Sequence, residues 1–501
     1  MEYPPPRVIL AHAVPPPPGA AAPRRRSRMV HSRCSHPLAT VIATVFMTFG
    51  STAPLLADDA AEDPSRQVSY YREIRPIFQE HCHGCHQPAK TRGDYVMTEF
   101  SALLAGGESG EPAVNPGHPE ASYLVQQITP DGEAASMPKG KAPLGQDQIA
   151  LIRRWVEQGA GNDTPASTRQ LVDMDHPPRY ESLPVVTSID FSSDGQWLAV
   201  SGYHEVLIHK SDGSALVSRL VGLSERIESA VFSPDASLLA VTGGSPGRMG
   251  ELQVWDVERA ELQLSLTITY DTIYGASWSP DGQSIALGCS DQTVRVIDLN
   301  TESQILYSRA HTDWVLDTVF SAEGDRVVSV GRDMTVKLTD VATQRFLGNI
   351  TTHTPGVLRG GMNAVDCNDK NEVVAVGADG APKLFRSEVT AAPSSGGNPN
   401  QIREYDALPG RGFDVRFSAD GIRIVAGSSY NGRGEVRVYR AEDGEQLVSL
   451  PDLEGGIYAV AFSPDGTTIA FGGFAGHISL ADASSGEIAK QFVPVPLENQ
   501  Q

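Results

Sequence analysis

Two patterns of hydrophobic and polar residues divide the chain. Between residues 66 and 160, apolar residues recur at helical spacing in one segment at each end of the stretch. These residues are Ile74, Ile77 and Phe78 in the first segment, and Ile149, Ile152, Trp155 and Val156 in the second. Gly- and Pro-rich segments separate them, and Gly159 and Gly161 end the second. We therefore expect two terminal helices that enclose loops, with a short helix near residues 120–127.

From about residue 180 a different pattern recurs. Each copy has an apolar strand, a tight turn of the S-P-D-G type and a second apolar strand, and further strands follow. The copies are IDFSSDGQWLAVSG (189), AVFSPDASLLAVTG (230), ASWSPDGQSIALGC (276), TVFSAEGDRVVSVG (318), VDCNDKNEVVAVGA (365), VRFSADGIRIVAGS (415) and VAFSPDGTTIAFGG (460). Their spacing is close to the roughly 40–45 residues of a four-stranded propeller blade. Seven copies predict a ring of seven blades.

Charge and the N-terminal residues change this picture in two ways. The net charge is −21, and the first 57 residues hold six Arg and one Glu, so the rest of the chain is more acidic still. Such a body disfavours nucleic acid as a partner, because phosphate binding needs a basic face. The apolar run from 38 to 49 follows arginines and precedes small residues that end at Ala57. It predicts a secretory signal peptide cleaved near Ala57, with Met29 as a possible start.

The predicted signal places the protein outside the cytoplasm, in the periplasm or a comparable compartment. A 12-residue apolar run is short for a membrane span, so we expect no integral span after cleavage. The alternative is an anchor that stays attached.

The segment CHGCH, residues 82–86, carries the candidate chemistry. Cys82 and Cys85 can each form a thioether with a porphyrin, and the adjacent His86 can reach the iron, which is typical of covalent c-type haem. Zinc would require two further well-spaced ligands, and a thioredoxin-like pair would require a βαβ context. The segment 66–160 holds no other cysteine. Haem is therefore favoured, and zinc or a redox disulfide are the alternatives. Met137, in SMPKG, is a candidate for the second axial ligand.

Residues 82–160 resemble the planctomycete-type cytochrome c domain. The matching segments, in order, are CHGCH, LLAGGESGEPAVNPGHPEASYL, MPKG and QIALIRRWVEQGA. The resemblance implies one haem c per chain, with His86 as proximal and Met137 as distal iron ligand. The chain departs from the family at Lys139, where a second proline is usual after Pro138, and at His118, where an acidic or amide residue is usual. Ligation through His118 is therefore the alternative to Met137.

The repeated copies resemble WD repeats over residues 185–493, on the strength of F-S-P-D-G and of V-W-D at residues 254–256. The expected fold is a small α-helical class I cytochrome c-like domain followed by a seven-bladed β-propeller. The expected divisions are an N-terminal extension and signal peptide (1–57), the haem domain (66–160), a linker (161–179) and the propeller (180–495).

One set of propeller residues suggests a partner surface. In several copies an aromatic residue directly precedes the S-P-D-G-type turn, and six residues before it the chain enters the first strand of the blade at one rim of the ring. Two long turns between the second and third strands are expected to reach this rim as well. The residues expected there are Arg226, Trp314, Arg411, Arg248 and Arg433. Arg and Trp are favoured in binding hot spots. We expect a protein or polysaccharide ligand at this rim, with ordinary surface loops as the alternative.

The sequence shows no nucleophile triad, phosphate loop or zinc hydrolase signature. The interpretation is an exported electron carrier with an unidentified redox protein partner, in which the propeller is an interaction scaffold. Two alternatives stay open: a haem-linked redox enzyme with a substrate site on the propeller, and a scaffold whose haem is structural.

Overall fold

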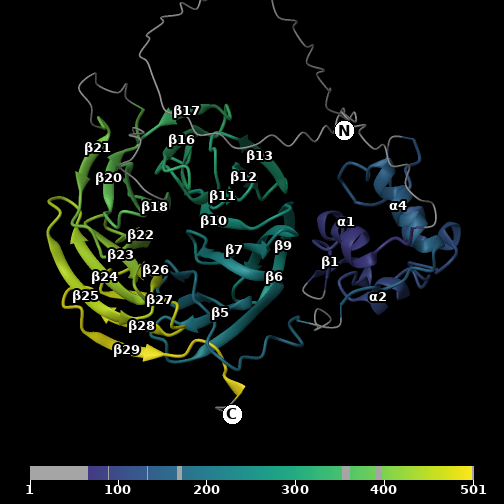
Figure 1. Ribbon diagram of the computed structural model, residues 1–501, viewed down its shortest axis with the longest axis horizontal. Coiled ribbons are helices and arrows are strands. Elements are labelled where there is room, and N and C mark those ends of the chain that lie inside the picture. Colours follow the sequence, from purple (N-terminus) through teal and green to yellow (C-terminus); the bar gives the residue numbers. More distant parts are fainter. Residues whose placement is uncertain are drawn as a thin grey trace, which may run out of the picture. The chain divides into compact units, whose positions relative to one another are not determined.

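The computed structural model describes residues 66–87, 90–132, 134–165, 172–351, 361–389 and 398–498 (Figure 1). The predicted signal peptide lies outside these residues. Residues 65–501 form one compact unit. In the described part of the chain, no helix is long and apolar enough to cross a membrane.

The helical domain occupies the beginning of this unit. Both predicted terminal helices are present, as α1 and α4, and the first is preceded by a turn of π-helix. The elements are η1 (Tyr70–Ile74), α1 (Arg75–His81), β1 (His86–Gln87), β2 (Lys90–Thr91), η2 (Arg92–Asp94), α2 (Phe100–Ala105), η3 (Pro119–Ala121), α3 (Tyr123–Ile128) and α4 (Gln146–Glu157). Pro76 stands in the first turn of α1, where its missing N–H costs no hydrogen bond.

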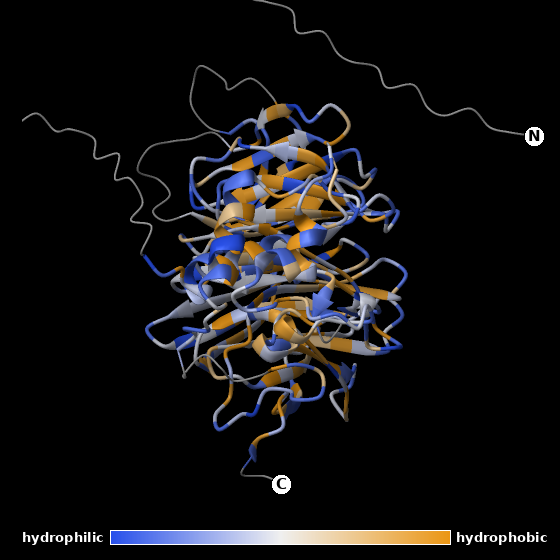
Figure 2. Ribbon diagram, turned by 90° about the vertical axis from the view of Figure 1, so that its right-hand side faces the viewer, coloured by the Kyte–Doolittle hydropathy of each residue, from blue (hydrophilic) through white to orange (hydrophobic). Residues whose placement is uncertain are grey.

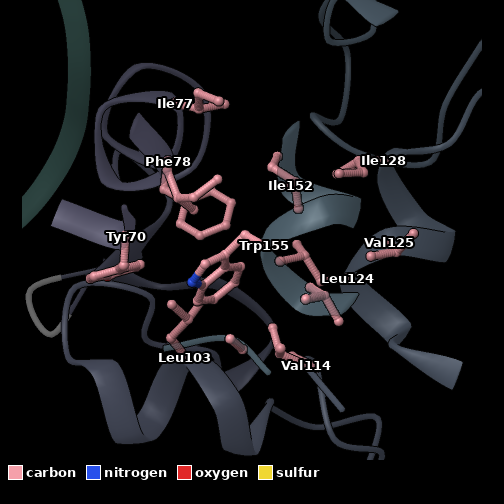
Figure 3. Close-up of a cluster of buried hydrophobic side chains, with 14 of the residues drawn as sticks. Tyr70, Ile77, Phe78, Leu103, Val114, Leu124, Val125, Ile128, Ile152 and Trp155 are labelled. Carbon is pink, nitrogen blue, oxygen red and sulfur yellow. The ribbon is translucent and has the colours of Figure 1, made fainter. Parts of the chain in front are cut away.

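Trp155 of α4 is the centre of the core of this domain. Its side chain is 1% exposed, and Tyr70, Phe78 and Phe100 surround its ring at centroid distances of 5.5, 6.3 and 6.2 Å. Figure 3 shows Trp155 between Tyr70, Phe78 and Leu103, with Ile152 on the same helix. The indole Nε1 donates to the backbone oxygen of Gly161 at 3.0 Å. These contacts join α1 to α4, although more than 60 residues separate the two helices in the sequence.

The β-domain consists of antiparallel sheets (Figure 1). Five sheets have four strands each, and a sixth joins seven strands in the order β3 to β9. The seven strands are β3 (Ile189–Phe191), β4 (Trp197–Ser201), β5 (Tyr203–Lys210), β6 (Leu216–Phe232), β7 (Leu238–Ser245), β8 (Met249–Asp256) and β9 (Glu261–Thr269).

The four-stranded sheets follow in chain order. They are β10 (Ile273–Trp278), β11 (Ser284–Cys289), β12 (Val294–Asp298) and β13 (Ser303–Ser308); β14 (Val315–Phe320), β15 (Arg326–Gly331), β16 (Val336–Asp340) and β17 (Phe346–Asn349); β18 (Met362–Cys367), β19 (Glu372–Gly377), β20 (Lys383–Arg386) and β21 (Gln401–Glu404); β22 (Arg411–Phe417), β23 (Arg423–Tyr430), β24 (Arg433–Arg440) and β25 (Gln446–Glu454); and β26 (Ile457–Phe462), β27 (Thr468–Gly473), β28 (Ile478–Asp482) and β29 (Ile488–Phe492). Within each sheet, neighbours in the sequence are neighbours in space. Figure 2 shows mainly hydrophobic strands connected by hydrophilic turns.

Strand β6 explains why one sheet has seven strands. Its first part pairs with β5, in the register Leu207↔Arg219, and its last part pairs with β7, in the register Ala230↔Val241. One continuous strand of 17 residues therefore serves as the outer strand of one four-stranded unit and as the inner strand of the next.

The first and last sheets meet without exchanging a strand. The last sheet has its own outer strand, β29. Closure depends on side chains instead: Ile189, Phe191 and Leu198 share a buried cluster with Ala461 and Leu480. The backbone adds hydrogen bonds from the N–H of Val186 to the carbonyl of Gly473 at 3.0 Å and, in the flanking segments, from the N–H of Glu498 to the carbonyl of Tyr180 at 3.1 Å.

Candidate functional site

The CHGCH segment forms a compact turn at the end of α1. The backbone N–H groups of Cys82 and His83 both donate to the carbonyl of Phe78, which ends the helix. The N–H groups of Cys85 and His86 then donate to the carbonyl of Cys82, each at 3.1 Å. His86 begins the short strand β1, and its carbonyl accepts from the N–H of Met97 at 2.8 Å. The spacing of the two cysteines is therefore fixed by backbone bonds.

A cavity of about 250 Å³ lies beside this turn, and Cys82, His86 and Met137 all line it. Met137 comes from the loop after α3, where its N–H donates to the carbonyl of Gln127 at 2.9 Å. The wall is largely apolar and includes Met97, which is 1% exposed. The three residues that the sequence predicts as a thioether donor and two iron ligands thus meet in one place. Cys85 is not part of the cavity wall; its thiol is free.

Burial sets the protonation of the groups at the cavity. It raises the pKa of the Cys82 thiol to about 12, with a smaller contribution from Cys85. It also lowers the pKa of His86, and it lowers the pKa of the neighbouring His83 to about 3. At neutral pH the thiol of Cys82 is therefore protonated and both imidazoles are neutral. Neutral imidazole is the form that binds a metal.

The residues present fit a haem. The ring of His86 lines the cavity, and its buried Nδ1 atom has no hydrogen-bond partner among the described residues. Met137 supplies a thioether sulfur at the same cavity, and neither cysteine of the motif is in a disulfide. Among the described residues there is no group of three or more His, Cys, Asp or Glu side chains arranged to hold a metal.

The two other histidines near the site have different surroundings. His118, the alternative distal ligand, is exposed at the start of η3 and is not part of the cavity wall. His81, which the sequence analysis did not select, lines the cavity, and its Nε2 lies 3.3 Å from Nε2 of Gln148 on α4. The sequence could have indicated His81 as a cavity residue, because it lies in the last turn of the predicted first helix, one residue before the CHGCH motif.

The predicted rim residues Arg226, Trp314, Arg411 and Arg433 are all exposed. Arg411 pairs with Ser429 at the end of β23, next to the turn that leads to Arg433, so these two share one end of their sheet. Trp314 stacks on Tyr274 with a centroid distance of 5.5 Å, and the guanidinium of Arg332 lies 4.6 Å from its ring centroid. The sequence analysis missed Tyr274 and Arg332, since only the pairing of β14 with β15 brings Arg332 to Trp314.

Arg248 has a different role from the one expected. Its guanidinium lies 5.0 Å from the ring centroid of Tyr71 and also donates a hydrogen bond to the Tyr71 hydroxyl. Glu225 is a further, weaker partner at 3.9 Å. Arg248 therefore contacts the helical domain and is not a free member of the rim.

Comparison with known proteins agrees with both parts of this architecture. Residues 82–140 match the model of planctomycete cytochrome C, and residues 179–217, 262–298, 303–340 and 444–482 match the model of the WD domain, G-beta repeat. A WD repeat-containing protein 26 homolog from Arabidopsis thaliana is 22% identical over 282 residues, which cover 55% of this chain and 44% of that protein.

Two further relatives match shorter segments. COMPASS component SWD3 from Saccharomyces cerevisiae is 26% identical over 160 residues, which cover 32% of this chain and 48% of that protein. WD repeat and SOCS box-containing protein 1 from Xenopus tropicalis is 35% identical over 112 residues, which cover 22% and 26%. The chain thus spans less than half the length of these curated relatives.

Both predicted resemblances are confirmed, and the family of the first domain implies haem at the motif that holds Cys82 and Cys85. The chain carries a planctomycete cytochrome C domain followed by WD repeats.

Proposed function

We propose that this protein is an exported c-type cytochrome that carries one haem and transfers single electrons, with a seven-bladed propeller as its docking scaffold. The observation that carries the proposal is the cavity that brings Cys82 and His86, from the CHGCH turn, together with Met137, from the loop after α3. When bound, haem supplies an iron that takes up and releases one electron.

The residues of the chain have separate roles in this proposal. Cys82 and Cys85 would hold the porphyrin through thioether bonds, and His86 and Met137 would hold the iron. The cavity wall is largely apolar, and methionine ligation raises the reduction potential. Arg92 lines the cavity and is exposed, so it places a positive charge at the entrance.

The pairing of β6 supports a count of seven blades. Because β6 pairs with both β5 and β7, the seven-stranded sheet can be divided into two four-stranded blades that share this strand, and the five four-stranded sheets would bring the number to seven. The buried cluster shared by the first and last sheets supports a closed ring.

The exposed rim supports a protein partner for the propeller. Trp314 is 37% exposed, and Tyr274 and Arg332 hold its ring in place. A rigid aromatic side chain beside arginines is typical of a binding hot spot. Replacing Trp314 and Arg411 together by alanine should weaken binding of a redox partner, and unchanged binding would argue against this surface.

The central experiment tests haem attachment. Residues 58–501 are expressed behind a periplasmic signal in a host that attaches c-type haem, and a denaturing gel is stained for haem peroxidase activity. We expect a stained band for the natural sequence, none for Cys82→Ser/Cys85→Ser, and an unchanged band for the control Cys289→Ser/Cys367→Ser. A chain that binds zinc and never haem would contradict the proposal.

Export is tested in the same host with the chain's own N-terminus. We expect the protein in the periplasmic fraction, with a mature N-terminus near Asp58. A chain that stays in the membrane with residues 38–49 still attached would support the anchor instead.

A further inference from the structure

Strand β9, the last strand of the seven-stranded sheet, has one edge that pairs with β8 and another that meets the helical domain. Two hydrogen bonds, each from a side chain to a backbone carbonyl, make this contact. The ammonium of Lys90 donates to the carbonyl of Gln263 at 2.7 Å, and the hydroxyl of Thr267 donates to the carbonyl of Gln79 at 2.9 Å. Gln79 lies in the last turn of α1, whose carbonyls have no partner within the helix.

The haem-attachment turn itself touches this edge. A Cβ atom added to Gly84, the middle residue of CHGCH, would lie 2.4 Å from the carbonyl oxygen of Ser265. Real Cβ atoms do not approach backbone oxygens so closely, so only glycine leaves room for the turn here. The close approach of the two backbones is thus the reason for glycine at this position.

Side chains on both sides extend the contact. The Tyr270 hydroxyl donates to Oε2 of Glu80 at 2.7 Å, and Nε2 of Gln79 lies 3.7 Å from the sulfur of Met249. Arg248 lies over Tyr71, as described above. On the side of the helical domain, the contact therefore extends from η1, through α1, to β2 just after the CHGCH segment.

A buried network holds β9 from behind. The hydroxyl of Ser265 donates to Glu251 at 2.5 Å, and the same carboxylate accepts from Ser224 and Gln253. Glu251 has no exposed surface. Because these bonds fix Ser265, the carbonyl that faces Gly84 has a defined position.

We infer that β9 is a positioning element for the turn that carries Cys82 and Cys85. The propeller then supports the turn from outside the cavity, whose lining residues all come from the helical domain, as well as offering a scaffold to other molecules. The role in the haem site rests on the function proposed above, whereas the docking of the turn on β9 does not.

The test uses the mature chain, prepared with haem and, from a host without the attachment machinery, without it. Hydrogen exchange is followed in peptides covering residues 79–87 and 261–269. For Gly84→Ala we expect exchange in both peptides to rise by about tenfold or more, since the added methyl group separates the two backbones. The control Gly161→Ala has its nearest neighbour at 3.7 Å and should leave both peptides unchanged.

A second variant covers the case in which Gly84→Ala does not fold. Thr267→Val/Tyr270→Phe removes two hydrogen bonds of the contact without adding volume, and it should raise exchange in the same two peptides. Tyr430→Phe, at an exposed tyrosine on β23, is its control. Unchanged exchange in residues 79–87 for both contact variants would overturn the inference.

Comparing the chain with and without haem distinguishes a failure of this inference from a failure of the proposed function. If the natural chain never acquires haem, the proposed function fails, and exchange in the haem-free chain still decides whether β9 holds the turn. If haem is present, the midpoint potential of Gly84→Ala should differ from that of Gly161→Ala. Faster exchange with an unchanged potential would overturn the positioning role.

Discussion

Arg416, on the inner strand β22, offers a sharp test of how the propeller is held together. Its Nε lies 3.3 Å from Asp414 and its Nη1 lies 4.0 Å from Asp317. The charges of Asp366 and Asp190 also act on it. Each of these four carboxylates accepts a hydrogen bond from the backbone of another inner strand. The perturbation is Arg416→Met, which keeps much of the volume and removes the charge.

The expected size of the effect follows from burial. Losing one partner of a fully buried ion pair destabilises a protein by roughly 3–5 kcal/mol, whereas an exposed pair contributes about 0–1 kcal/mol. About a third of the Arg416 side chain is exposed, at 34%, and both carboxylates are nearly buried. We therefore expect a loss of about 2–3 kcal/mol in the free energy of unfolding at pH 8.

The loss should depend on pH. Burial raises the pKa of Asp190 and Asp317 to about 7 in the folded protein, far above their usual value. Between about pH 4 and 7 the folded state therefore binds more protons than the unfolded state, and stability falls as pH rises. Without Arg416 the pKa of both carboxyls rises further. The destabilisation should then be smaller at pH 5, where these carboxyls are protonated, than at pH 8.

Urea unfolding, followed by circular dichroism at pH 5 and pH 8, measures both quantities. Arg309→Met, at an exposed arginine, is the matched control and should change little at either pH. A loss in Arg416→Met that is equal at the two pH values, or no larger than in the control, would refute this reasoning.

Three further predictions concern the two domains. Met137→Leu should keep covalent haem and lower the reduction potential by at least about 60 mV, a tenfold change for a one-electron couple; an unchanged potential in voltammetry would exclude Met137 as ligand. Trp155→Ala should destabilise the helical domain by about 3–5 kcal/mol, seen as earlier loss of the haem spectrum in urea. Burial alone would raise the pKa of Asp333. Hydrogen bonds to its carboxylate, above all the one from His311, instead hold this pKa well below its usual range. Asp333→Asn should therefore cost about 1–3 kcal/mol at pH 7 and less below about pH 4, and an equal cost at both would contradict it.

The sequence was sufficient for features that depend on near neighbours. The spacing of Cys82, Cys85 and His86 fits within one turn of backbone, so the motif could be recognised without a fold. Helical periodicity located α1 and α4, and the repeated turns located the paired strands of every copy.

The sequence was insufficient where distant residues meet. Arg248 looked like a rim residue, because its turn is long and polar, but Tyr71 lies against it from 177 positions away. Tyr274 and Arg332 gave no sign of their contacts with Trp314. The aspartates around Arg416 come from four different copies, and in each copy alone they are ordinary strand residues.

The amino-acid sequence by itself determined the two kinds of domain and the chemistry of the CHGCH motif, because helix periodicity, turn chemistry and ligand spacing are local properties. Only the tertiary structure decided that Met137 shares a cavity with His86 while His118 does not, that the first and last sheets close through side chains, and that Gly84 lies against β9. These outcomes depend on which surfaces pack together. Packing is settled by the combined burial and hydrogen bonding of residues far apart in the chain, and no short segment encodes it.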